Sequence, residues 1–548
     1  MKNKNCSHLT RRQFIKSGLT GFAIGSSVGI LGCDPMGIPL PTATRTETED
    51  DVPALIIGSG FGGAVTALRL GEAGIQTMVL EQGRRWDTAF SRNIPPDGRS
   101  TWLRNKTILP FGPEFSIQKY TGVLDRVDYP NMKVYRGTAV GGGSIVYGGI
   151  SIEPPEELFY EVFPRGVSYQ ELHPYYDRVR DILGISTVPA DIEKASHYEY
   201  ARVFAKHAAN AGLEAISIGQ AADWDIIRSE IAGTILPSAI IGEMLYGGNS
   251  DYKNSLDRNY LPMAEATGYV TIHSLHRVTN IRQHNSGKYA VTVENIDETG
   301  KVLQTKEITT TSLFFAAGSI GTTELLVKAR HTGNLAKLNE DVGKGWGTNG
   351  NVLFSRSIDE STGKMQGGPV IIGVSDYGNT QTPASVESVF LPIVHDCRCL
   401  LQLLIGLDTE RGDFSYDSIR NKAVLNWSST GNARAASAAA DFTARMNAAN
   451  GGTLGISEGV PFPIPDVSAD FTYQPLGGMV MGKACDFYGR VHGYPRMYVM
   501  DGSLLPGSCA TANPSLTIAA FAERNIERIL TDDLTMNREK IEKREIDR

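Results

Sequence analysis

The sequence predicts a protein of the α/β class (α+β) that contains a Rossmann-like sheet. An apolar run at residues 52–57 has the composition of a buried parallel strand. A glycine-rich turn follows at 58–63, and an apolar helical run occupies 64–70. A second apolar strand is expected at 76–80. The order strand, turn, helix, strand is that of a βαβ unit.

The turn carries a glycine pattern that is typical of phosphate binding. Gly58, Gly60 and Gly63 satisfy G-x-G-x-x-G. The first glycine permits a tight turn, the second lets the backbone approach a pyrophosphate, and the third lets helix and strand pack closely. Glu81 follows the second strand at about the 20-residue spacing expected of the acid that binds ribose hydroxyls. The segment therefore predicts a dinucleotide site.

Composition excludes several classes of protein. Glycine contributes 59 of 548 residues, against a usual share of about 7%. The hydrophobic content of 41% is too high for a disordered chain, and the glycines lack a collagen period. A formal net charge of −7 argues against nucleic acid as the main partner. The length fits two or three domains, or one large enzyme unit with an inserted lobe.

The N-terminal 33 residues resemble an export signal. Arg11 and Arg12 precede an apolar, small-residue run at 17–32, as in twin-arginine signals. Residues 30–33 also resemble a bacterial lipobox, in which Cys33 would carry lipid. A plain cleaved signal and an amphipathic N-terminal helix are the alternatives. We expect a periplasmic or extracellular protein, with residues 34–51 as a solvated tether and with peripheral or lipid-anchored membrane contact.

The cysteines do not suggest a disulfide framework. Cys6 would leave with the signal, and the remaining four are Cys397, Cys399, Cys485 and Cys509. We expect these four to be buried thiols. His395, Cys397 and Cys399 alternate and would share one face of a strand, but no second cluster supplies further ligands, so we expect no metal.

Further blocks accompany the first turn. A second glycine cluster occupies 137–149, where many missing side chains imply close backbone approach. Gln474 precedes Gly477 and Gly478, Asp501 lies in the run 497–506, and Asn513 leads into a helical run at 516–530.

Together these blocks resemble the glucose-methanol-choline (GMC) flavin oxidoreductases, most closely the bacterial cholesterol oxidases that bind FAD non-covalently. The similarity runs from about 52 to about 530 and includes the segments 120–127, 315–326 and 345–351. The resemblance implies a discontinuous FAD domain and a substrate domain with a mixed sheet. The expected boundaries are 52–155, 265–355 and 470–530 for the FAD domain, 156–264 and 356–469 for the substrate domain, and 531–548 for a charged tail.

The resemblance also implies site residues. Those expected to contact FAD are Gly58, Gly60, Phe61, Gly62, Gly63, Glu81, Gly141, Gly142, Gly143, Ser144, Gly149, Val278, Asp501 and Asn513. Asn513 and Gln474 are the expected catalytic residues, with Asn513 polarising the substrate hydroxyl and Gln474 orienting it.

Several positions depart from the family pattern. Gln474 stands where the family has a histidine, and glutamine cannot accept a proton near neutral pH. Alignment puts Pro392 where cholesterol oxidases have a glutamate, so double-bond isomerisation through that residue is expected to be lost. Three nearby residues could substitute for that acid: Glu387, His395 and Asp396. Tyr147 replaces a family asparagine beside the flavin.

The resemblance implies an FAD-dependent enzyme that oxidises a bulky apolar secondary alcohol, such as a 3β-hydroxysterol, to a ketone. Dioxygen would reoxidise the flavin and yield hydrogen peroxide, and a role in steroid and lipid metabolism would follow. The alternative is an FAD-binding protein without alcohol oxidase activity: a lyase, an isomerase, a desaturase or a lipid-binding protein. We also expect strands at 389–394 and 400–407, a scaffold helix at 435–449, and no transmembrane helix outside the signal.

Overall fold

The computed structural model describes residues 47–86, 94, 98–103, 118–392, 394–455 and 466–535. The predicted export signal, Cys33 and most of the tether lie outside the described residues, and so does the end of the charged tail. Those expectations stay predictions.

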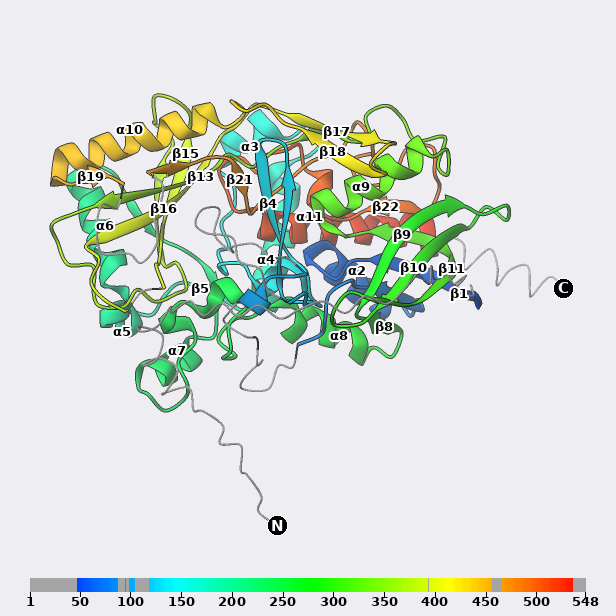
Figure 1. Cartoon of the computed structure of the whole chain (residues 1–548), viewed down its shortest axis with the longest axis horizontal. Coiled ribbons are helices and arrows are strands. Elements are labelled where there is room, and N and C mark those ends of the chain that lie inside the picture. The colour runs from blue at the N-terminus through cyan, green and yellow to red at the C-terminus, as the bar shows by residue number, and fades with distance from the viewer. Residues whose placement is uncertain are drawn as a thin grey trace, which may run out of the picture. The chain divides into compact units, whose positions relative to one another are not determined.

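A seven-stranded sheet lies in the right-hand half of the molecule as drawn in Figure 1. Its strand order is β8 (Val270–His273), β2 (Thr77–Leu80), β1 (Glu47–Ile57), β11 (Val302–Phe315), β10 (Tyr289–Ile296) and β9 (His276–Gln283), and β22 (Met497–Val499) pairs with β11. Strands β8, β2, β1, β11 and β22 run parallel, whereas β9 and β10 are antiparallel to their neighbours. The sheet is therefore mixed, with a Rossmann-like parallel part.

Strand β1 begins earlier than the sequence predicts. Residues 47–51, the end of the expected tether, pair with the first half of β11. The apolar residues 54–57 are buried between neighbouring strands, as expected for a central parallel strand.

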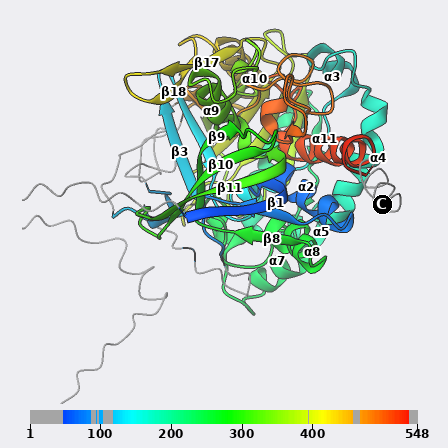
Figure 2. The same ribbon diagram turned by 90° about the vertical axis from the view of Figure 1, so that its right-hand side faces the viewer.

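Helices follow the strands as the sequence predicts. Helix α2 (Phe61–Glu72) starts at the glycine turn after β1, and α9 (Gly318–His331) starts directly after β11. Helix α11 (Pro514–Ile529) packs against α2 and α4 (Tyr169–Leu183). In Figure 2 the strands β1, β11, β10 and β9 lie beside one another, with α2, α4 and α11 on one side of them. The helices expected at 64–70 and 516–530 are confirmed.

A second seven-stranded sheet carries the other half of the molecule. Its order is β19 (Thr453–Leu454), β13 (Asn351–Ser357), β16 (Cys399–Gly406), β15 (Ala384–Val389), β14 (Ile372–Asp376) and β6 (Ala215–Ser217), and β20 (Val467–Ser468) pairs with β13. The pairs described for this sheet are all antiparallel, because consecutive strands β14, β15 and β16 return directly beside one another. An isolated parallel bridge also joins Arg356 of β13 to Gly455.

Helices α6 (Glu199–Asn210) and α10 (Ala433–Asn450) pack on this second sheet. The expected helix at 435–449 and strand at 400–407 are confirmed. The strand expected at 389–394 is wrong, because β15 ends at Val389. Pro392 has no backbone N–H to donate to a neighbouring strand, and the chain leaves the sheet before reaching it.

Smaller elements connect the two sheets. A ribbon of β3 (Leu124–Tyr129) and β4 (Met132–Gly137) stands in the middle of Figure 1, with β21 (Phe471–Thr472) beside β4. The other elements are α3 (Glu156–Val162), α5 (Ala190–Glu193), α7 (Trp224–Ile231), α8 (Tyr260–Ala266), β5 (Ile185–Ser186), β7 (Gln220–Ala221), β12 (Lys344–Trp346), β17 (Gly412–Asp417) and β18 (Lys422–Asn426).

Two of the cysteines form a disulfide, which the sequence did not predict. Cys397 and Cys399 are bonded to each other, with Cα atoms 5.2 Å apart. That separation lies within the range a disulfide requires, and the bond removes both sulfurs from the metal site considered for this segment. Cys485 and Cys509 are buried free thiols, as expected.

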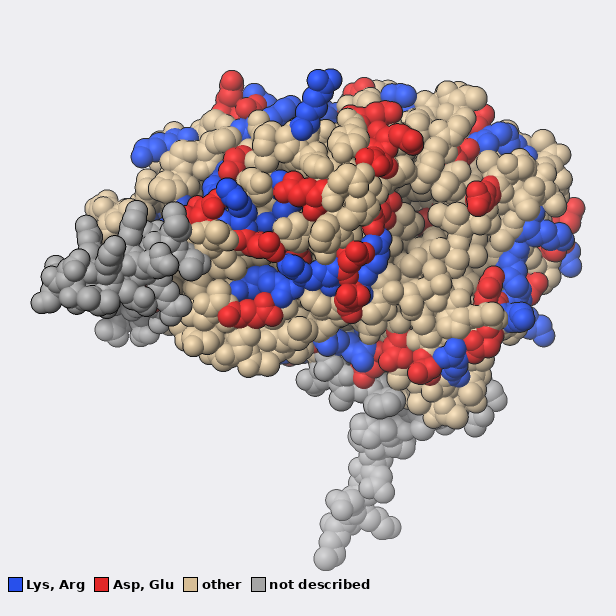
Figure 3. All heavy atoms as spheres, turned by 180° about the vertical axis from the view of Figure 1, so that it is seen from behind, with Lys and Arg blue, Asp and Glu red and all other residues tan. Residues whose placement is uncertain are grey.

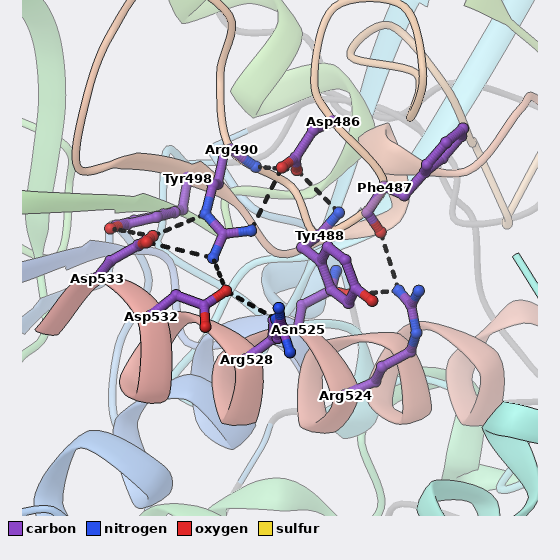
Figure 4. Close-up of polar contacts among 10 residues, drawn as sticks. All are labelled: Asp486, Phe487, Tyr488, Arg490, Tyr498, Arg524, Asn525, Arg528, Asp532 and Asp533. Atoms are coloured by element: carbon purple, nitrogen blue, oxygen red, sulfur yellow. Dashed lines mark hydrogen bonds and ion pairs between the residues drawn. The ribbon is translucent and has the colours of Figure 1, made fainter. Parts of the chain in front are cut away.

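The end of α11 is held by a polar cluster (Figure 4). The helix continues into a wider turn over Leu530–Thr535. Arg490 donates through Nε to Asp533 at 2.8 Å, and the Tyr498 hydroxyl donates to the same carboxylate at 3.0 Å. The first residues of the predicted charged tail therefore belong to the folded domain rather than to a frayed end.

Acidic and basic side chains are interspersed over the face drawn in Figure 3. None of the described helices is both long and apolar enough to span a membrane.

Candidate active site

A cavity of about 780 Å³ reaches both sheets. Its lining includes the turn between β1 and α2, part of β9 and the start of α9, together with residues of β15 and β16 from the second sheet. A volume of this size is typical of cofactor and substrate sites.

The glycines of the first turn have different reasons to be glycine. A Cβ on Gly62 would lie 1.8 Å from the Met500 carbonyl oxygen, and one on Gly63 would lie 2.1 Å from that of Gly58. Gly58 itself has φ +99°, a left-handed conformation that favours glycine. In contrast, a Cβ on Gly60 or Gly143 would meet no protein atom within 4 Å. Since Gly60 and Gly143 both line the cavity, their missing side chains leave room for a ligand.

The N-terminus of α2 opens onto the same space. Gly60 is its N-cap, and no side chain caps the free N–H groups of the first turn. Uncapped helix N-termini with glycine at the approach favour an anionic group such as a phosphate. Gly142 closes the turn from the other side, because its Cβ would lie 2.7 Å from the Gly60 Cα.

Most of the predicted cofactor residues line the cavity. They are Gly58, Gly60, Phe61, Gly62, Glu81, Gly142, Gly143, Val278, Asp501 and Asn513. Four do not line it: Gly63, Gly141, Ser144 and Gly149. Three of them make hydrogen bonds within the protein instead. The Ser144 hydroxyl donates to the Gly141 carbonyl at 2.7 Å, and the Gly149 carbonyl accepts from the Ala221 N–H at 2.9 Å.

Two buried carboxylates brace this half of the cavity. Glu81 accepts from the Ser59 N–H and hydroxyl at 3.1 and 2.8 Å and from the Gly83 N–H at 2.8 Å. Asp501 accepts from the Gly318 N–H at 2.9 Å, which ties the start of α9 to the segment after β22. Burial raises the pKa of both carboxyl groups, and the hydrogen bonds offset part of that rise.

Three polar side chains meet in the other half of the cavity: Gln474, Asn513 and Glu387. Asn513 is the N-cap of α11, whose uncapped N-terminus faces the cavity through Pro514 and Ser515. The hydroxyl of Ser385, two residues before Glu387 on β15, donates to the Thr511 carbonyl at 2.5 Å. This bond fixes β15 against the loop that carries Asn513.

Glu387 has the chemistry of a proton carrier. Burial raises the pKa of its carboxyl to about 8, and its contact with the Asn513 side chain offsets part of that rise. Both of its carboxylate oxygens and the Asn513 Oδ1 are buried, and none meets the usual hydrogen-bond geometry with a described residue. A carboxyl with a pKa near 8 can exchange a proton with a bound ligand close to neutral pH.

The cavity therefore contains a carboxyl group five residues before Pro392, the position at which the family pattern has a glutamate. Pro392 lines the cavity as well, but His395 and Asp396 do not. Asp396 instead accepts from the backbone N–H groups of Thr362 and Arg398. One sequence signal could have identified Glu387: it is a charged residue in a strand whose other members are apolar or small.

Gln474 is held by two asparagines that the sequence did not single out. Its Oε1 accepts from Asn349 Nδ2 at 2.9 Å and from Asn351 Nδ2 at 3.0 Å. Tyr147 also lines the cavity, where its ring meets Phe61 edge-on at 5.4 Å between centroids.

The walls around the three polar side chains are apolar. They are formed by Ile150, Met244, Leu353, Val370, Val389, Phe390, Leu391, Leu401 and Leu403. The arrangement suits a large hydrophobic molecule that carries one oxygen function.

Comparison with protein families agrees with this geometry. A GMC oxidoreductase family model matches residues 53–343, more than half of the chain. The chain belongs to the GMC oxidoreductase family. A second GMC oxidoreductase model matches 409–522, and a model of the C-terminal part of GMC oxidoreductases matches 349–455. Membership makes the protein an oxidoreductase that acts on CH–OH groups.

Individual relatives match most of the chain. A cholesterol oxidase of Acinetobacter baumannii is 26% identical over 87% of this chain and 94% of its own. A cholesterol oxidase of Mycobacterium tuberculosis is 27% identical over 86% of this chain and 90% of its own. Among solved structures, the GMC fold is shared with a fungal aryl-alcohol oxidase (TM-score 0.60, 12% identity, 88% and 100% of the two chains) and with pyridoxine 4-oxidase from Mesorbium loti (TM-score 0.59, 15% identity, 87% and 99%).

Proposed function

We propose that this GMC oxidoreductase binds FAD non-covalently and oxidises the secondary hydroxyl of a bulky apolar alcohol, of the 3β-hydroxysterol class, to a ketone. Dioxygen is the proposed final acceptor, so that one alcohol and one dioxygen give one ketone and one hydrogen peroxide. The observation that carries the proposal is that one cavity contains two kinds of lining. The glycine-rich turns, with Gly60 and Gly143, form a glycine cradle at one part, and apolar walls form a chamber around Glu387, Asn513 and Gln474 at the other.

The residues present fit FAD. Gly60 and Gly143 leave open space beside the uncapped N-terminus of α2, where a pyrophosphate would bind. Glu81 and Val278 line the part that would take the adenosine. Bound FAD would supply the acceptor for the hydride that leaves the carbinol carbon.

The chain's own groups divide the remaining work. The ionised Glu387 accepts the hydroxyl proton, because it is the titratable group among the three polar side chains of the chamber. Asn513 and Gln474 position the substrate oxygen, and the apolar walls exclude water from it. The alternative, a flavoprotein without alcohol oxidation, rests on the loss of the family histidine at Gln474 and of the family glutamate at Pro392. Glu387 supplies a carboxyl group in the same cavity, which weakens this alternative.

Anaerobic mixing of the purified holoprotein with a panel of alcohols tests the proposal. We expect 3β-hydroxysterols to bleach the flavin absorbance, whereas short-chain alcohols leave it unchanged. Admission of dioxygen should then restore the absorbance and release hydrogen peroxide. A failure of every alcohol to reduce the flavin would overturn the proposal, and a lipid that binds without reduction would favour the alternative.

The two kinds of glycine in the first turn give a matched prediction. Gly60→Ala should weaken FAD binding by about tenfold or more, because its methyl group enters the space of the pyrophosphate. The thermal midpoint of the apoprotein should stay unchanged. Gly63→Ala should lower that midpoint, since its Cβ would clash with the Gly58 carbonyl. Calorimetric titration with FAD and thermal unfolding of the apoprotein check both expectations.

We also propose export through a twin-arginine system, with lipid attached at Cys33. The support is the sequence alone, in Arg11, Arg12 and the apolar run before Cys33. Replacement of both arginines by lysine should leave the protein in the cytoplasm of the producing cell, as cell fractionation would show. Secretion of that variant at the normal level would refute the proposal.

A further inference from the structure

The orientation of the Gln474 amide is set by its two neighbours. A glutamine amide can present either its oxygen, an acceptor, or its nitrogen, a donor, to a ligand. Which of the two faces the cavity depends on what the other end of the amide meets. In this structure the other end meets Asn349 and Asn351, so the orientations of those amides must be established first.

The backbone fixes the Asn349 amide. Its Oδ1 accepts from the Cys509 N–H at 2.7 Å, and its Nδ2 donates to the Ala512 carbonyl at 2.9 Å. A backbone N–H can only donate and a carbonyl can only accept, so this amide has one satisfactory orientation. Asn349 is fully buried and has φ +56°, a left-handed conformation that asparagine tolerates better than most residues.

The backbone fixes the Asn351 amide in the same way. Its Oδ1 accepts from the Tyr473 N–H at 3.1 Å, which leaves Nδ2 to face Gln474. Asn351 is also fully buried. Gln474 thus meets two buried N–H donors, and only its Oε1 can satisfy both.

Gln474 therefore presents Nε2 to the cavity. We propose that Asn349 and Asn351 lock Gln474 as a hydrogen-bond donor to the ligand oxygen, which makes Gln474 a specificity-determining residue for an oxygen that accepts. The site would recognise the ketone through the same donor as the alcohol, and the alcohol would keep its hydroxyl proton available for Glu387. The chemical class of ligand in this inference rests on the proposed function, whereas the lock itself does not.

The hydrogen bonds that orient Gln474 can be tested without a substrate or a steroid probe. Gln474→Met is nearly isosteric but removes the shared acceptor, and leaves two buried amide donors unsatisfied. We expect the thermal midpoint of the holoprotein to fall by about 2 °C or more. A midpoint equal to that of the wild type would overturn the lock, because an amide whose oxygen was not required could be replaced without loss.

The polarity at the cavity has a separate test. Gln474→Glu keeps an oxygen for the two asparagines and turns the cavity-facing group from a donor into an acceptor. The probes are a saturated 3-ketosteroid and a 3-methyl-3-hydroxysteroid, a tertiary alcohol with no hydride to lose. Binding of each is measured by perturbation of the flavin spectrum in wild type and variant.

We expect the variant to lose about tenfold or more in affinity for the ketone while it keeps its affinity for the alcohol, which can donate to the new carboxylate. Equal losses for both probes would overturn the donor assignment. If neither probe binds the wild type but Gln474→Met is destabilised, the proposed function fails and the lock stands.

Discussion

Glu387→Gln is expected to slow anaerobic reduction of the flavin by a substrate alcohol by about 10²–10⁴-fold, the usual contribution of a general base. Glutamine has nearly the same shape but cannot accept the hydroxyl proton. The cavity should still bind the alcohol, because the apolar walls, Asn513 and Gln474 are unchanged. Stopped-flow reduction at saturating alcohol measures the effect as a rate.

Ser388→Ala is the matched control for this variant. Ser388 is the next residue on β15, is fully buried and does not line the cavity. Its removal should leave the reduction rate within a factor of about two. A Glu387→Gln rate as high as that of Ser388→Ala would assign the base to another group.

The rate of the wild type should also depend on pH. Since burial raises the pKa of Glu387 to about 8, the ionised fraction grows as the pH rises through that value. We expect the reduction rate to increase between about pH 6 and pH 9, with an apparent pKa near 8. Glu387→Gln should lose this dependence, and a flat wild-type profile would contradict the assignment.

The same pKa shift has a consequence for stability. Folding disfavours the ionised form of this carboxyl group. At pH values below its ordinary pKa of 4.5, Glu387 is protonated in both the folded and the unfolded state and has no such effect on the free energy of unfolding. As the pH rises from 4.5 toward about 8, Glu387 increasingly destabilises the folded state. Glu387→Gln should therefore gain stability relative to the wild type at alkaline pH, by at most about 5 kcal/mol. Urea unfolding of both proteins at acidic and alkaline pH measures the difference, and an unchanged difference would argue against the raised pKa.

Glu523→Gln is expected to destabilise the protein by about 1.5–3 kcal/mol, because it removes a buried carboxylate that accepts charge-assisted hydrogen bonds from two partly exposed arginines. Glu523 on α11 is fully buried. It accepts two bonds of 2.7 Å from Arg69 on α2, one of 3.3 Å from Arg178 on α4, and one of 2.9 Å from the hydroxyl of Tyr260 on α8. The pair with Arg69 joins α2 and α11, two of the helices whose N-termini line the cavity.

Glu527→Gln is the control for that prediction. Glu527 lies one turn later on α11, is exposed and also contacts Arg178 at 3.3 Å. Exposed ion pairs of this kind contribute about 0–1 kcal/mol. Denaturant unfolding of both variants should therefore separate them clearly, and similar small losses would show that the Glu523 cluster is weakly coupled to folding.

Local patterns predicted much of the cofactor half of the molecule. The βαβ unit, the glycine turn and α11 of this half, and α10 of the other half, can be read from the sequence because each depends on residues close together in the chain. The strand expected at 389–394 is wrong because the apolar pattern continues past Val389, the residue at which β15 ends. The disulfide was missed because Cys397 and Cys399 are separated by one residue, and the sequence does not reveal the left-handed backbone of Arg398 between them.

The sequence by itself determined the family, the glycine cradle and two of the three polar residues of the chamber, because these lie in motifs with a fixed order along the chain. Only the tertiary structure decided that Glu387 supplies the acid and that Gln474 presents a donor. The partners of Gln474, Asn349 and Asn351, lie 125 and 123 residues away in sequence. The backbone groups that orient them belong to the segment 509–512 and to Tyr473, which precedes Gln474. Hydrogen-bond polarity and burial arise from such distant contacts, and these exist only once the chain has folded.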